Sequence, residues 1–544
     1  MNARRAGWEL PVLLVAAAVV ALPDLFDLEA FKLGAVALLA AVVLLPWLIW
    51  AGRDDVAGWY STLGARLLLF TAAWSLLGSL TVLHHAAVAD RVLGLLLAQL
   101  AAVLGLRAAR AAPGALLGAL QIVVMVTAVV GLVQAAGIDR LFTSSSLQVV
   151  ALMGNTTRAG ALLALGVVAA FVTVTDGTLD ARDWRLRLGL SALLLGSAAL
   201  VLTRARGGWI AAAGGLLAVA FMARDTALQR LKLWAPRVIL GVGLAVVLAD
   251  DHWHVLTASK LPDQAATVAG AGAVGAAVPG GDVTVQVRLA IWRACLPMIA
   301  RQPLEGWGLG RFRESFPPFR DPAEAALPGL GGARTEVDHP HNEFVLAFAE
   351  GGAPAGLCLL AFAALTLWRG GRRARHGGSG DVLAFGVVVA GTLVALVQNA
   401  WTSPGTALPI FAAAGWIWRP DVEPLFRPAA RAATGALLLA AMAALVILAV
   451  PRVESECLLR RFYLRADADG GYSRENIPLL VRAADADPGD PDVQRVLLTY
   501  GTQLEAALAG GKAPESAELA QALQRARARL AELAPSAAGP EAPH

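Results

Sequence analysis

Charged residues are scarce in this chain, and their scarcity decides its class. Only 16% of the 544 residues are Asp, Glu, Lys or Arg, whereas 57% are hydrophobic. The mean hydropathy is +0.61. A water-soluble enzyme of this length needs more charge on its surface, so a lipid bilayer must surround most of the chain.

Cysteine and histidine are also rare. The chain has three cysteines and eight histidines. Cys295, Cys358 and Cys457 form no C-x-x-C pair and no ligand cluster. A disulfide between Cys295 and Cys457 is the alternative, but we expect all three to be unpaired. A P-loop and a G-x-S-x-G element are absent as well, so the sequence offers neither this nucleotide-binding loop nor a serine-hydrolase nucleophile.

Long apolar runs recur along the chain, and a membrane helix needs about 20 apolar residues. Such runs lie at about 8–22, 31–50, 64–83, 92–106, 114–137, 159–175, 188–203, 207–222, 237–249, 343–368, 382–400, 407–418 and 433–450. The first run ends at Leu22-Pro23-Asp24 without a small-residue cleavage site, so we interpret it as a retained helix. The predicted fold class is an all-α, polytopic membrane helical bundle of about 12–13 transmembrane helices.

Basic residues orient the predicted bundle. One assignment places nearly all basic clusters between the runs on one side, and that side is the cytoplasm by the positive-inside rule. The clusters are Arg4/Arg5, Arg53, Arg107/Arg110, Arg182/Arg185/Arg187, Arg224/Arg230/Lys232, Arg369/Arg372/Arg373/Arg375 and Arg427/Arg431. The pI of about 9.2 mostly reflects this signal, so no nucleic-acid partner is expected. We therefore expect a membrane protein with a cytoplasmic N-terminus, in which the long interval 250–342 and the residues after about 451 face outward.

Five regions follow from these patterns. They are residues 1–249 with about nine transmembrane helices, a long outer loop at 250–342, residues 343–450 with about four transmembrane helices, an outer helical domain at 451–534, and a disordered tail at 535–544. In the loop, residues 259–283 are rich in Ala, Gly, Val and Pro and are expected to be mobile. The helical domain should contain helices at 473–486, 491–508 and 514–533 that are similar to a tetratricopeptide pair.

A helix is also predicted at 285–300, inside the long loop. Leu289, Trp292, Leu296 and Ile299 recur at helical spacing, whereas the arginines lie off this stripe. We expect this helix to lie on the membrane interface and to end at Gln302-Pro303.

The segment Asp338-His339-Pro340-His341-Asn342-Glu343 closes the loop and leads into an apolar helix. Imidazole can accept a proton near neutral pH, so a His pair at the membrane surface is a candidate general base. The alternative is that the two histidines are zinc ligands with Asp338 or Glu343, but no third His or Cys stands nearby, so the base is preferred and no metal is expected. Glu350 is an acid within an apolar span on roughly the same side, which marks it as a functional candidate.

Two further clusters carry arginines. Thr203-Arg204-Ala205-Arg206-Gly207-Gly208 lies on the predicted outer face. Its arginines have two interpretations. They are interface anchors, or they are phosphate ligands, because a guanidinium binds phosphate oxygens in a bidentate way. We expect the glycines to let a large headgroup approach the backbone. The second cluster joins Arg288 and Trp292 to Pro303-Leu304-Glu305-Gly306-Trp307-Gly308-Leu309-Gly310-Arg311. Its glycines are read as a tight turn that directs Arg311, since no strand precedes them. Trp292 is either an interfacial belt residue or a sugar-stacking platform.

In this order, the clusters resemble the O-antigen ligase and polymerase superfamily of bacterial envelope glycosyltransferases. The resemblance covers roughly residues 10–450. It rests on His341-Asn342 followed by Gly352, on Arg206-Gly207, Arg288-x-x-x-Trp292, Pro303-Leu304-x-Gly306-x-Gly308 and Gly154-Asn155. Two departures occur: Ala355 stands where a second glycine is expected, and Asn155-Thr156-Thr157-Arg158 replaces an Asn-x-x-Asn pattern.

The resemblance implies a lipid-sugar-dependent transferase with no cofactor and no metal. It also implies a bacterial inner-membrane protein whose active face, long loop and C-terminal helical domain are periplasmic. The donor would be a glycan on undecaprenyl diphosphate, whose diphosphate Arg206 and Arg288 would hold, with Arg204 beside them. His341 would activate the acceptor hydroxyl, together with His339, and a single displacement would invert the anomeric carbon. The residues assigned to substrate positioning are Asn342, Trp292, Arg311, Glu350, Asn155 and Arg158.

The acceptor is left open by the sequence. It is lipid A core in a ligase, a second lipid-linked glycan in a polymerase, or a protein hydroxyl in an oligosaccharyltransferase, and the ligase is the leading interpretation. The alternative function that is not enzymatic is a polysaccharide flippase. Transporters tend to carry ionisable sites near mid-bilayer in repeated halves, and here the notable charges gather at one face.

Overall fold

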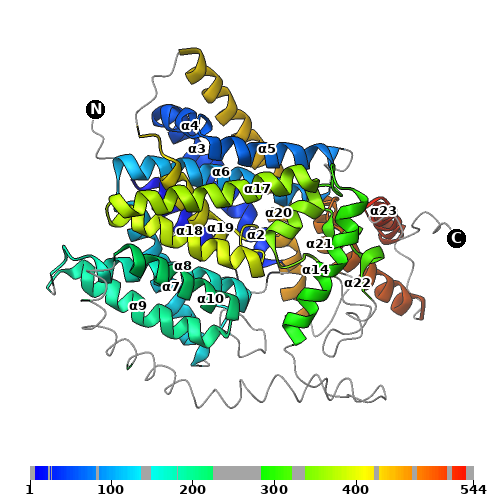
Figure 1. The fold of residues 1–544 in the computed structure, drawn as a ribbon. Helices are drawn as coiled ribbons and strands as arrows, with labels where there is room; N and C mark the ends of the chain where they lie inside the picture. Colours follow the sequence, from blue (N-terminus) through cyan, green and yellow to red (C-terminus); the bar gives the residue numbers. More distant parts are fainter. Residues whose placement is uncertain are drawn as a thin grey trace.

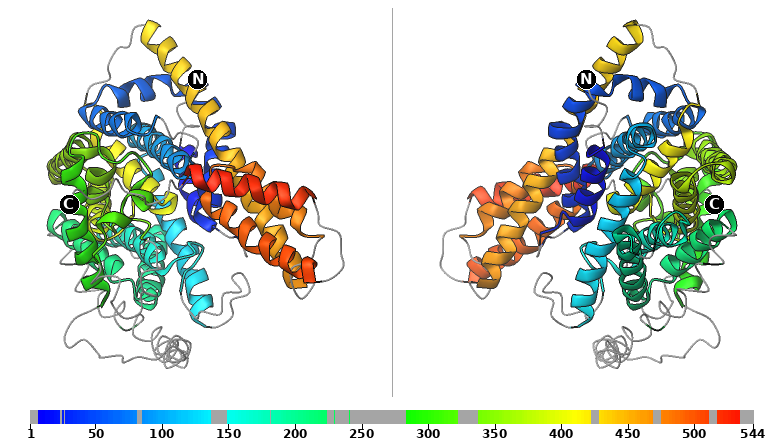
Figure 2. Two further views of the ribbon diagram at one scale, coloured as in Figure 1. Left: turned by 90° about the vertical axis from the view of Figure 1, so that its right-hand side faces the viewer. Right: turned by 90° about the vertical axis from the view of Figure 1, so that its left-hand side faces the viewer.

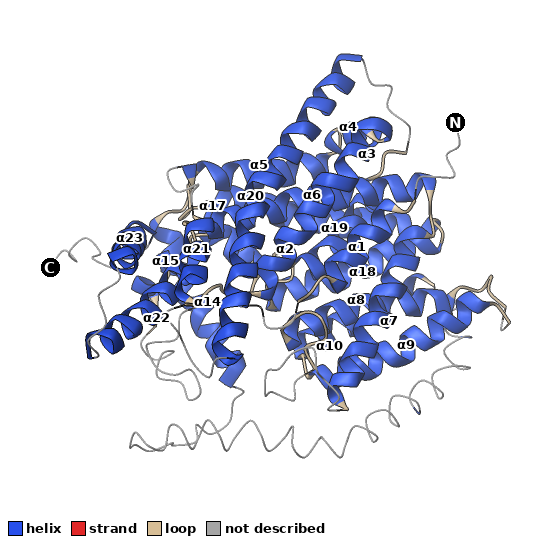
Figure 3. Ribbon diagram, turned by 180° about the vertical axis from the view of Figure 1, so that it is seen from behind, coloured by secondary structure: helices blue, strands red, loops and turns tan. Residues whose placement is uncertain are grey.

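A computed structural model describes residues 7–22, 25, 27–80, 85–136, 149–180, 182–223, 229, 240, 283–321, 337–421, 428–468, 475–510 and 517–533. Within these residues every regular element is a helix, and no strand occurs (Figure 3). The predicted all-α class is confirmed.

The helices in the first half of the chain are α1 (Glu9–Val19), α2 (Leu28–Leu39), the π-helical η2 (Ala40–Leu44), α3 (Leu45–Ala51), α4 (Arg53–Tyr60), α5 (Leu63–Leu77), α6 (Ala86–Ala111), α7 (Ala115–Ala135), α8 (Thr156–Thr175), α9 (Trp184–Thr203) and α10 (Arg206–Met222). Those in the second half are α14 (Val283–Arg301), α15 (Phe312–Ser315), the 3-10 helix η5 (Pro317–Phe319), α17 (Glu343–His376), α18 (Ser379–Val397), α19 (Pro404–Trp418), α20 (Pro428–Ala468), α21 (Ile477–Ala486), α22 (Pro491–Gly510) and α23 (Ala517–Leu533). Figure 1 labels most of them.

Eight helical stretches of the described chain are long and apolar enough to cross a membrane, and three shorter helices, α1, α5 and α10, are also apolar. The eight are Leu28–Ala51, Ala86–Ala111, Ala115–Ala135, Thr156–Thr175, Trp184–Thr203, Glu343–His376, Ser379–Val397 and Ala432–Ala466. The chain is therefore a multi-pass membrane protein, as predicted. The apolar run at 237–249, the stretch at 259–283 and the tail at 535–544 lie outside the described residues, apart from residues 240 and 283.

Small residues allow the central helices to pack in backbone contact. A Cβ atom placed on Gly105 of α6 would lie 1.9 Å from the carbonyl oxygen of Ala412 in α19. One on Gly415 of α19 would lie 1.8 Å from the carbonyl oxygen of Ala102 in α6. Close approach through small residues is how membrane helices gain packing energy when lipid removes the hydrophobic driving force. The backbones of α6 and α19 thus lie in contact along these glycines.

The described helices have two chemically different ends. At one end, Arg107 of α6 lies 2.6 Å from Asp55 of α4, and the guanidinium of Arg369 in α17 lies 5.3 Å from the ring centroid of Trp418. At the other end, the start of α17 follows residues 337–342 and packs near α14, and the C-terminal helices lie toward the same, right-hand side of Figure 1. We call these the basic end and the His end.

The helix predicted at 285–300 is present as α14, and it ends at Arg301, next to the expected stop. Its packed face differs from the predicted stripe. Ile291, Cys295 and Met298 are buried against α15 and α17, whereas Leu289 and Leu296 are exposed. An exposed leucine pair on a surface helix suits contact with lipid, which agrees with an interfacial position. All three cysteines are free, as predicted.

The C-terminal helices form a unit with their own hydrophobic core. Helices α21, α22 and α23 were expected from the sequence, and they project to one side of the membrane helices (Figure 2). The span predicted to end near 450 instead continues as α20 to Ala468, with Pro451 inside it. The expected boundary at 451 therefore falls within a helix, and Leu459 and Phe462 of α20 pack into the core of this unit. We call α21–α23 the tail.

Candidate active site

Residues 337–342, the His segment, enter α17 at the His end. The side-chain oxygen of Asn342 accepts hydrogen bonds from the backbone N–H groups of Phe344 (2.9 Å) and Val345 (3.1 Å), which caps α17. Its amide nitrogen donates to the carbonyl oxygen of Leu396 at the end of α18 (3.0 Å). Asn342 therefore anchors the His segment to two helices. Its contact with substrate stays a prediction.

The two imidazoles of the His segment lie against each other. The ring centroids of His339 and His341 are 4.6 Å apart, with an interplanar angle of 65°. His341 has a φ of 53°, in the left-handed region that side chains other than glycine enter at an energetic cost. The indole nitrogen of Trp292 in α14 donates to the carbonyl oxygen of Pro340 (2.7 Å). The indole thus holds the strained backbone between the histidines, and its stacking on a sugar stays a prediction.

Both histidines are uncharged near neutral pH. Burial, and then the positive charge of Arg288, lowers the pKa of His341 to about 4. Burial also lowers the pKa of His339 well below its ordinary value, with further contributions from His341, Arg91, Arg158 and Arg288. An uncharged imidazole has a lone pair that accepts a proton, so either ring is chemically competent as a base. These effects also place Arg288 within electrostatic reach of both rings.

The glycines after Arg206 do not serve the purpose expected of them. Arg206 is exposed and begins α10. A Cβ on Gly207 would lie 2.2 Å from the side-chain nitrogen of Gln398, and one on Gly208 would lie 2.7 Å from the backbone of Gly160. Protein atoms therefore fill the space that we expected a headgroup to enter. The glycines let α10 pack against α18 and α8 instead.

The C-terminal end of α18 joins the arginine cluster to the His segment. Gln398 faces Gly207, and Leu396 accepts the hydrogen bond from Asn342. Arg204 adopts a φ of 54° as it ends α9, which turns the chain into α10. The structure thus brings the Arg204–Arg206 turn and the His segment to the same end of one helix.

The turn at residues 303–310 lies against a kink in α17. Its three glycines all have positive φ, from 67° to 97°. The N–H of Gly308 donates to the carbonyl oxygen of Glu350 (2.9 Å). Gly352 has a φ of 66° and breaks α17, and a Cβ there would lie 2.4 Å from the carbonyl oxygen of Leu304. The glycine pattern therefore forms a tight turn docked on α17, as predicted, and Gly352 provides its docking site.

Three other predicted positioning residues have partners within the protein. The Nε of Arg311 lies 3.3 Å from Glu314. Asn155 caps α8 through its side-chain oxygen, 2.8 Å from the N–H two residues later. Arg158 lies 3.4 Å from Glu29. Of these, Arg158 and Arg311 also border the cavity described next.

A cavity of about 1850 Å³ opens beside the His segment. Four predicted site residues line it: His339, Arg158, Arg311 and Glu350. The other predicted residues are not among its lining: His341, Arg204, Arg206, Arg288, Asn155, Trp292 and Asn342. Carboxylates and arginines stand among apolar side chains on its wall, so the cavity offers both polar and apolar contacts to a ligand. The predicted site therefore has a cavity side and an arginine side, which meet at the His pair.

Arg91 is a site residue that the sequence analysis missed. It lies near the start of α6, lines the cavity and is 3.6 Å from the carboxylate of Glu350. Glu350 is buried, so this pairing compensates a charge that would otherwise be costly there. The signal was available, because Arg91 is a basic residue on the face opposite the basic clusters, as are Arg204 and Arg206.

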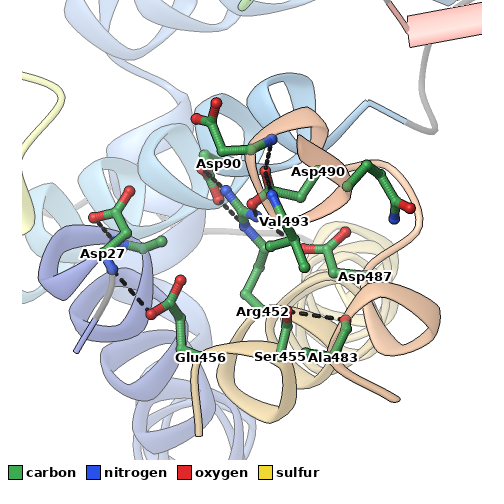
Figure 4. Close-up of polar contacts among 12 residues, drawn as sticks. Asp27, Asp90, Arg452, Ser455, Glu456, Ala483, Asp487, Asp490 and Val493 are labelled. Carbon is green, nitrogen blue, oxygen red and sulfur yellow. Dashed lines mark hydrogen bonds and ion pairs between the residues drawn. The ribbon is translucent and has the colours of Figure 1, made fainter. Parts of the chain in front are cut away.

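Carboxylates between the membrane helices and the tail are held by arginine. In Figure 4, Arg452 of α20 reaches Asp90 of α6 (2.9 Å), Asp487 after α21 (2.8 Å) and Asp490. Asp490 also caps α22, since its other oxygen accepts from the N–H of Asp492 (2.8 Å). No group of three potential metal-binding side chains is found in the described part of the chain. The aspartates here serve as structural ion pairs.

Comparison with known families agrees with this geometry. Residues 190–360 match the family model described as O-antigen ligase, and this stretch includes α10, α14, the glycine turn and the His segment. The matched stretch is about a third of the chain, and it supports membership of the O-antigen ligase and polymerase superfamily. A comparison with curated proteins finds no match. Family membership supports a glycosyltransferase-like enzyme whose partners are, in general terms, a lipid-linked glycan and an acceptor.

Proposed function

We propose that the protein transfers a glycan from undecaprenyl diphosphate to an acceptor hydroxyl at the periplasmic face of the inner membrane, as an O-antigen ligase. The observation that carries the proposal is the pair of histidines in contact, whose pKa values are lowered by burial and by Arg288, with His339 on the wall of a cavity that arginines and carboxylates also line. A base, a cationic group and room for a hydroxyl-bearing acceptor are what a displacement at an anomeric carbon requires.

Each group has a role in a single displacement. His341, with His339 beside it, takes the proton of the acceptor hydroxyl as the oxygen forms its bond to the anomeric carbon. The bond from that carbon to the diphosphate oxygen breaks on the opposite face, so the configuration inverts. Arg288 and Arg206, with Arg204 nearby, stabilise the charge that develops on the departing diphosphate.

The division of the site into two sides supports separate paths for the two substrates. The donor would lie on the side of Arg288 and Arg206. The acceptor would enter through the cavity next to His339, near Arg91 and Glu350. The histidines then stand where the substrates meet.

The acceptor that we favour is lipid A core, and the alternatives keep the same chemistry. A purified preparation given a lipid-linked glycan should be offered lipid A core, a second lipid-linked glycan and a protein acceptor in separate reactions. Product with lipid A core is expected. Extension of the lipid-linked glycan alone would establish a polymerase, and movement of the glycan across vesicles without any product would favour a flippase.

The catalytic roles are tested by one histidine substitution and its matched control. His341→Ala should lower transfer by about 10²–10⁴-fold, the usual cost of losing a general base, while donor binding stays near the wild-type value. His376→Ala changes an exposed histidine at the opposite end of the same helix α17 and should have no effect. Wild-type turnover by His341→Ala would remove the base assignment.

Donor binding is tested at the arginines. Arg206→Ala and Arg288→Ala should weaken binding of a lipid diphosphate analogue, and lysine should restore it only in part, because an ammonium cannot form the bidentate fork. Arg375→Ala, at the basic end of α17, is the control. Equal affinity in all variants would return both residues to an interface-anchor role.

Activity should also survive chelation, because we expect no metal. Loss of activity on chelation and its restoration by zinc or magnesium would reassign the histidines as metal ligands.

A further inference from the structure

The connection between α21 and α22 is part of the wall of the cavity. Asp490, Pro491 and Asp492 line the cavity together with His339. This wall therefore belongs to the C-terminal tail, which lies outside the matched family region at residues 190–360. The position of this wall relative to the His segment therefore depends on contacts between the tail and the rest of the chain.

Two arginines hold the connection, and they differ in burial. Arg452 is 7% exposed and binds Asp487 and Asp490, as described above. Arg313, in the short helix α15, has a side chain that is 31% exposed and binds Asp492 through both terminal nitrogens, at 2.8 and 3.1 Å. The first contact is a buried anchor. The second is a bidentate pair at the rim of the cavity.

Arg313 also reaches the His segment. Its Nε lies 3.2 Å from a carboxylate oxygen of Asp338, the residue that precedes His339. One planar guanidinium therefore contacts the tail with its two terminal nitrogens and the His segment with its third. Burial would raise the pKa of Asp492, but hydrogen bonds and charge from Arg313 and Arg495 outweigh it and lower that pKa. Asp492 therefore stays ionised at pH values below those at which an ordinary aspartate becomes protonated, and its pair with Arg313 persists there.

We propose that Arg313 is a positioning residue that couples the tail to the His segment, so that docking of Asp492 sets the placement of His339 at the cavity. Asp338 transmits the placement through its bond to Arg313. The structural consequence, which is the placement of the His segment by the tail, does not depend on what reaction the protein catalyses. Its catalytic consequence rests on the glycan transfer proposed above.

The structural consequence is tested without substrate, on the full-length protein in detergent. Hydrogen–deuterium exchange should become faster at residues 337–342 in Asp492→Asn, although the substitution lies in the tail. Arg525→Ala, which removes an exposed tail arginine 3.5 Å from Asp485, is the control and should leave that exchange unchanged. Equal exchange in wild type and Asp492→Asn, with the tail still folded, overturns the coupling whatever the protein's reaction proves to be.

The catalytic consequence is tested by a mutant cycle. Arg313→Ala, Asp338→Asn and Asp492→Asn should each lower kcat about tenfold, as expected for the loss of a charge-assisted pair, with the KM for donor unchanged. In the Arg313→Ala background the two aspartate substitutions should add nothing, because the bridge is already broken. Arg313→Lys should recover only part of the rate. Additive losses, or a changed donor KM with normal kcat, overturn the coupling, whereas absence of transfer by the wild-type protein counts against the proposed function alone.

Discussion

The indole nitrogen of Trp292 lies 2.7 Å from the carbonyl oxygen of Pro340, between the two histidines of the site. This bond ties α14 to the His segment at the point where His341 takes up its left-handed conformation. α14 also carries Arg288, one turn before Trp292, so a single helix supplies both a candidate phosphate ligand and the support of the candidate base. Movement of α14 would therefore disturb both groups together.

Trp292→Phe tests this support, because it keeps an aromatic ring and removes the donor. The lost hydrogen bond should cost about 0.5–1.5 kcal/mol locally, and release of the strained backbone should lower kcat several-fold with the donor KM unchanged. Steady-state kinetics with the donor and acceptor varied in turn check this. Trp184→Phe, at an exposed tryptophan of α9, should behave as wild type. A rise in KM with normal kcat would instead indicate that Trp292 contacts a substrate directly.

The pH dependence follows from the lowered pKa of His341. A pKa of about 4 keeps this imidazole unprotonated at pH values where an ordinary histidine becomes protonated, so the form that acts as a base persists in mild acid. In the unfolded chain the pKa returns to about 6.5, so this residue makes folding less favourable as pH falls between those two values. Modification of His341 by diethylpyrocarbonate, located by mass spectrometry, should therefore stay fast in mild acid.

Arg288→Gln should move this titration upward, because the charge of Arg288 is the second cause of the shift after burial. The apparent pKa of His341 should rise toward the ordinary value without reaching it, since burial remains. Arg293→Gln, at an exposed arginine of the same helix, is the control. An identical titration in wild type and Arg288→Gln would show that Arg288 lies too far from the ring to assist it.

Hydropathy located the apolar helices because a bilayer requires long apolar runs. Twelve of the thirteen runs coincide with described helices, whereas eight described stretches are long and apolar enough to cross a membrane, fewer than the 12–13 expected. Hydropathy failed at the end of α20. Hydrophobicity falls beyond Arg452, which marks where side chains leave lipid, but backbone hydrogen bonds continue to Ala468. The hydrophobicity of a segment indicates whether lipid or water surrounds the helix, but it does not indicate where the helix ends. Pro451 likewise did not interrupt the helix.

The candidate site was predicted where its residues are close in sequence, as in the His segment and the glycine turn. It was missed where distant segments meet. Arg91 pairs with Glu350, and Arg313 joins Asp338 to Asp492, through contacts that only the packed helices create. The glycines after Arg206 were misread for the same reason, since the neighbouring helices that fill their space are remote in the chain.

Gly352→Ala tests the docking of the glycine turn on α17. An alanine would be strained at a φ of 66°, and its Cβ would lie 2.4 Å from the carbonyl oxygen of Leu304. The strain alone should cost about 1–3 kcal/mol, so the thermal midpoint should fall. Gly118→Ala in α7 is the control, because nothing lies within 4 Å of the added carbon there. That variant should be neutral or gain up to about 1 kcal/mol of helix stability. A loss in Gly118→Ala equal to that in Gly352→Ala would contradict the turn-docking argument.

Arg452→Ala tests the anchor of the tail. It leaves Asp90, Asp487 and Asp490 without the guanidinium that binds them, and removing one partner from a buried ion pair costs about 3–5 kcal/mol. The tail should undock, and protease should cleave it at a concentration that spares the wild-type protein. Arg529→Ala is the matched control, because its pair with Asp485 is more exposed and should contribute about 1 kcal/mol or less. If the tail of Arg452→Ala resists protease as well as the control, solvent already screens these carboxylates, and the packing of Leu459 and Phe462 must hold the tail instead.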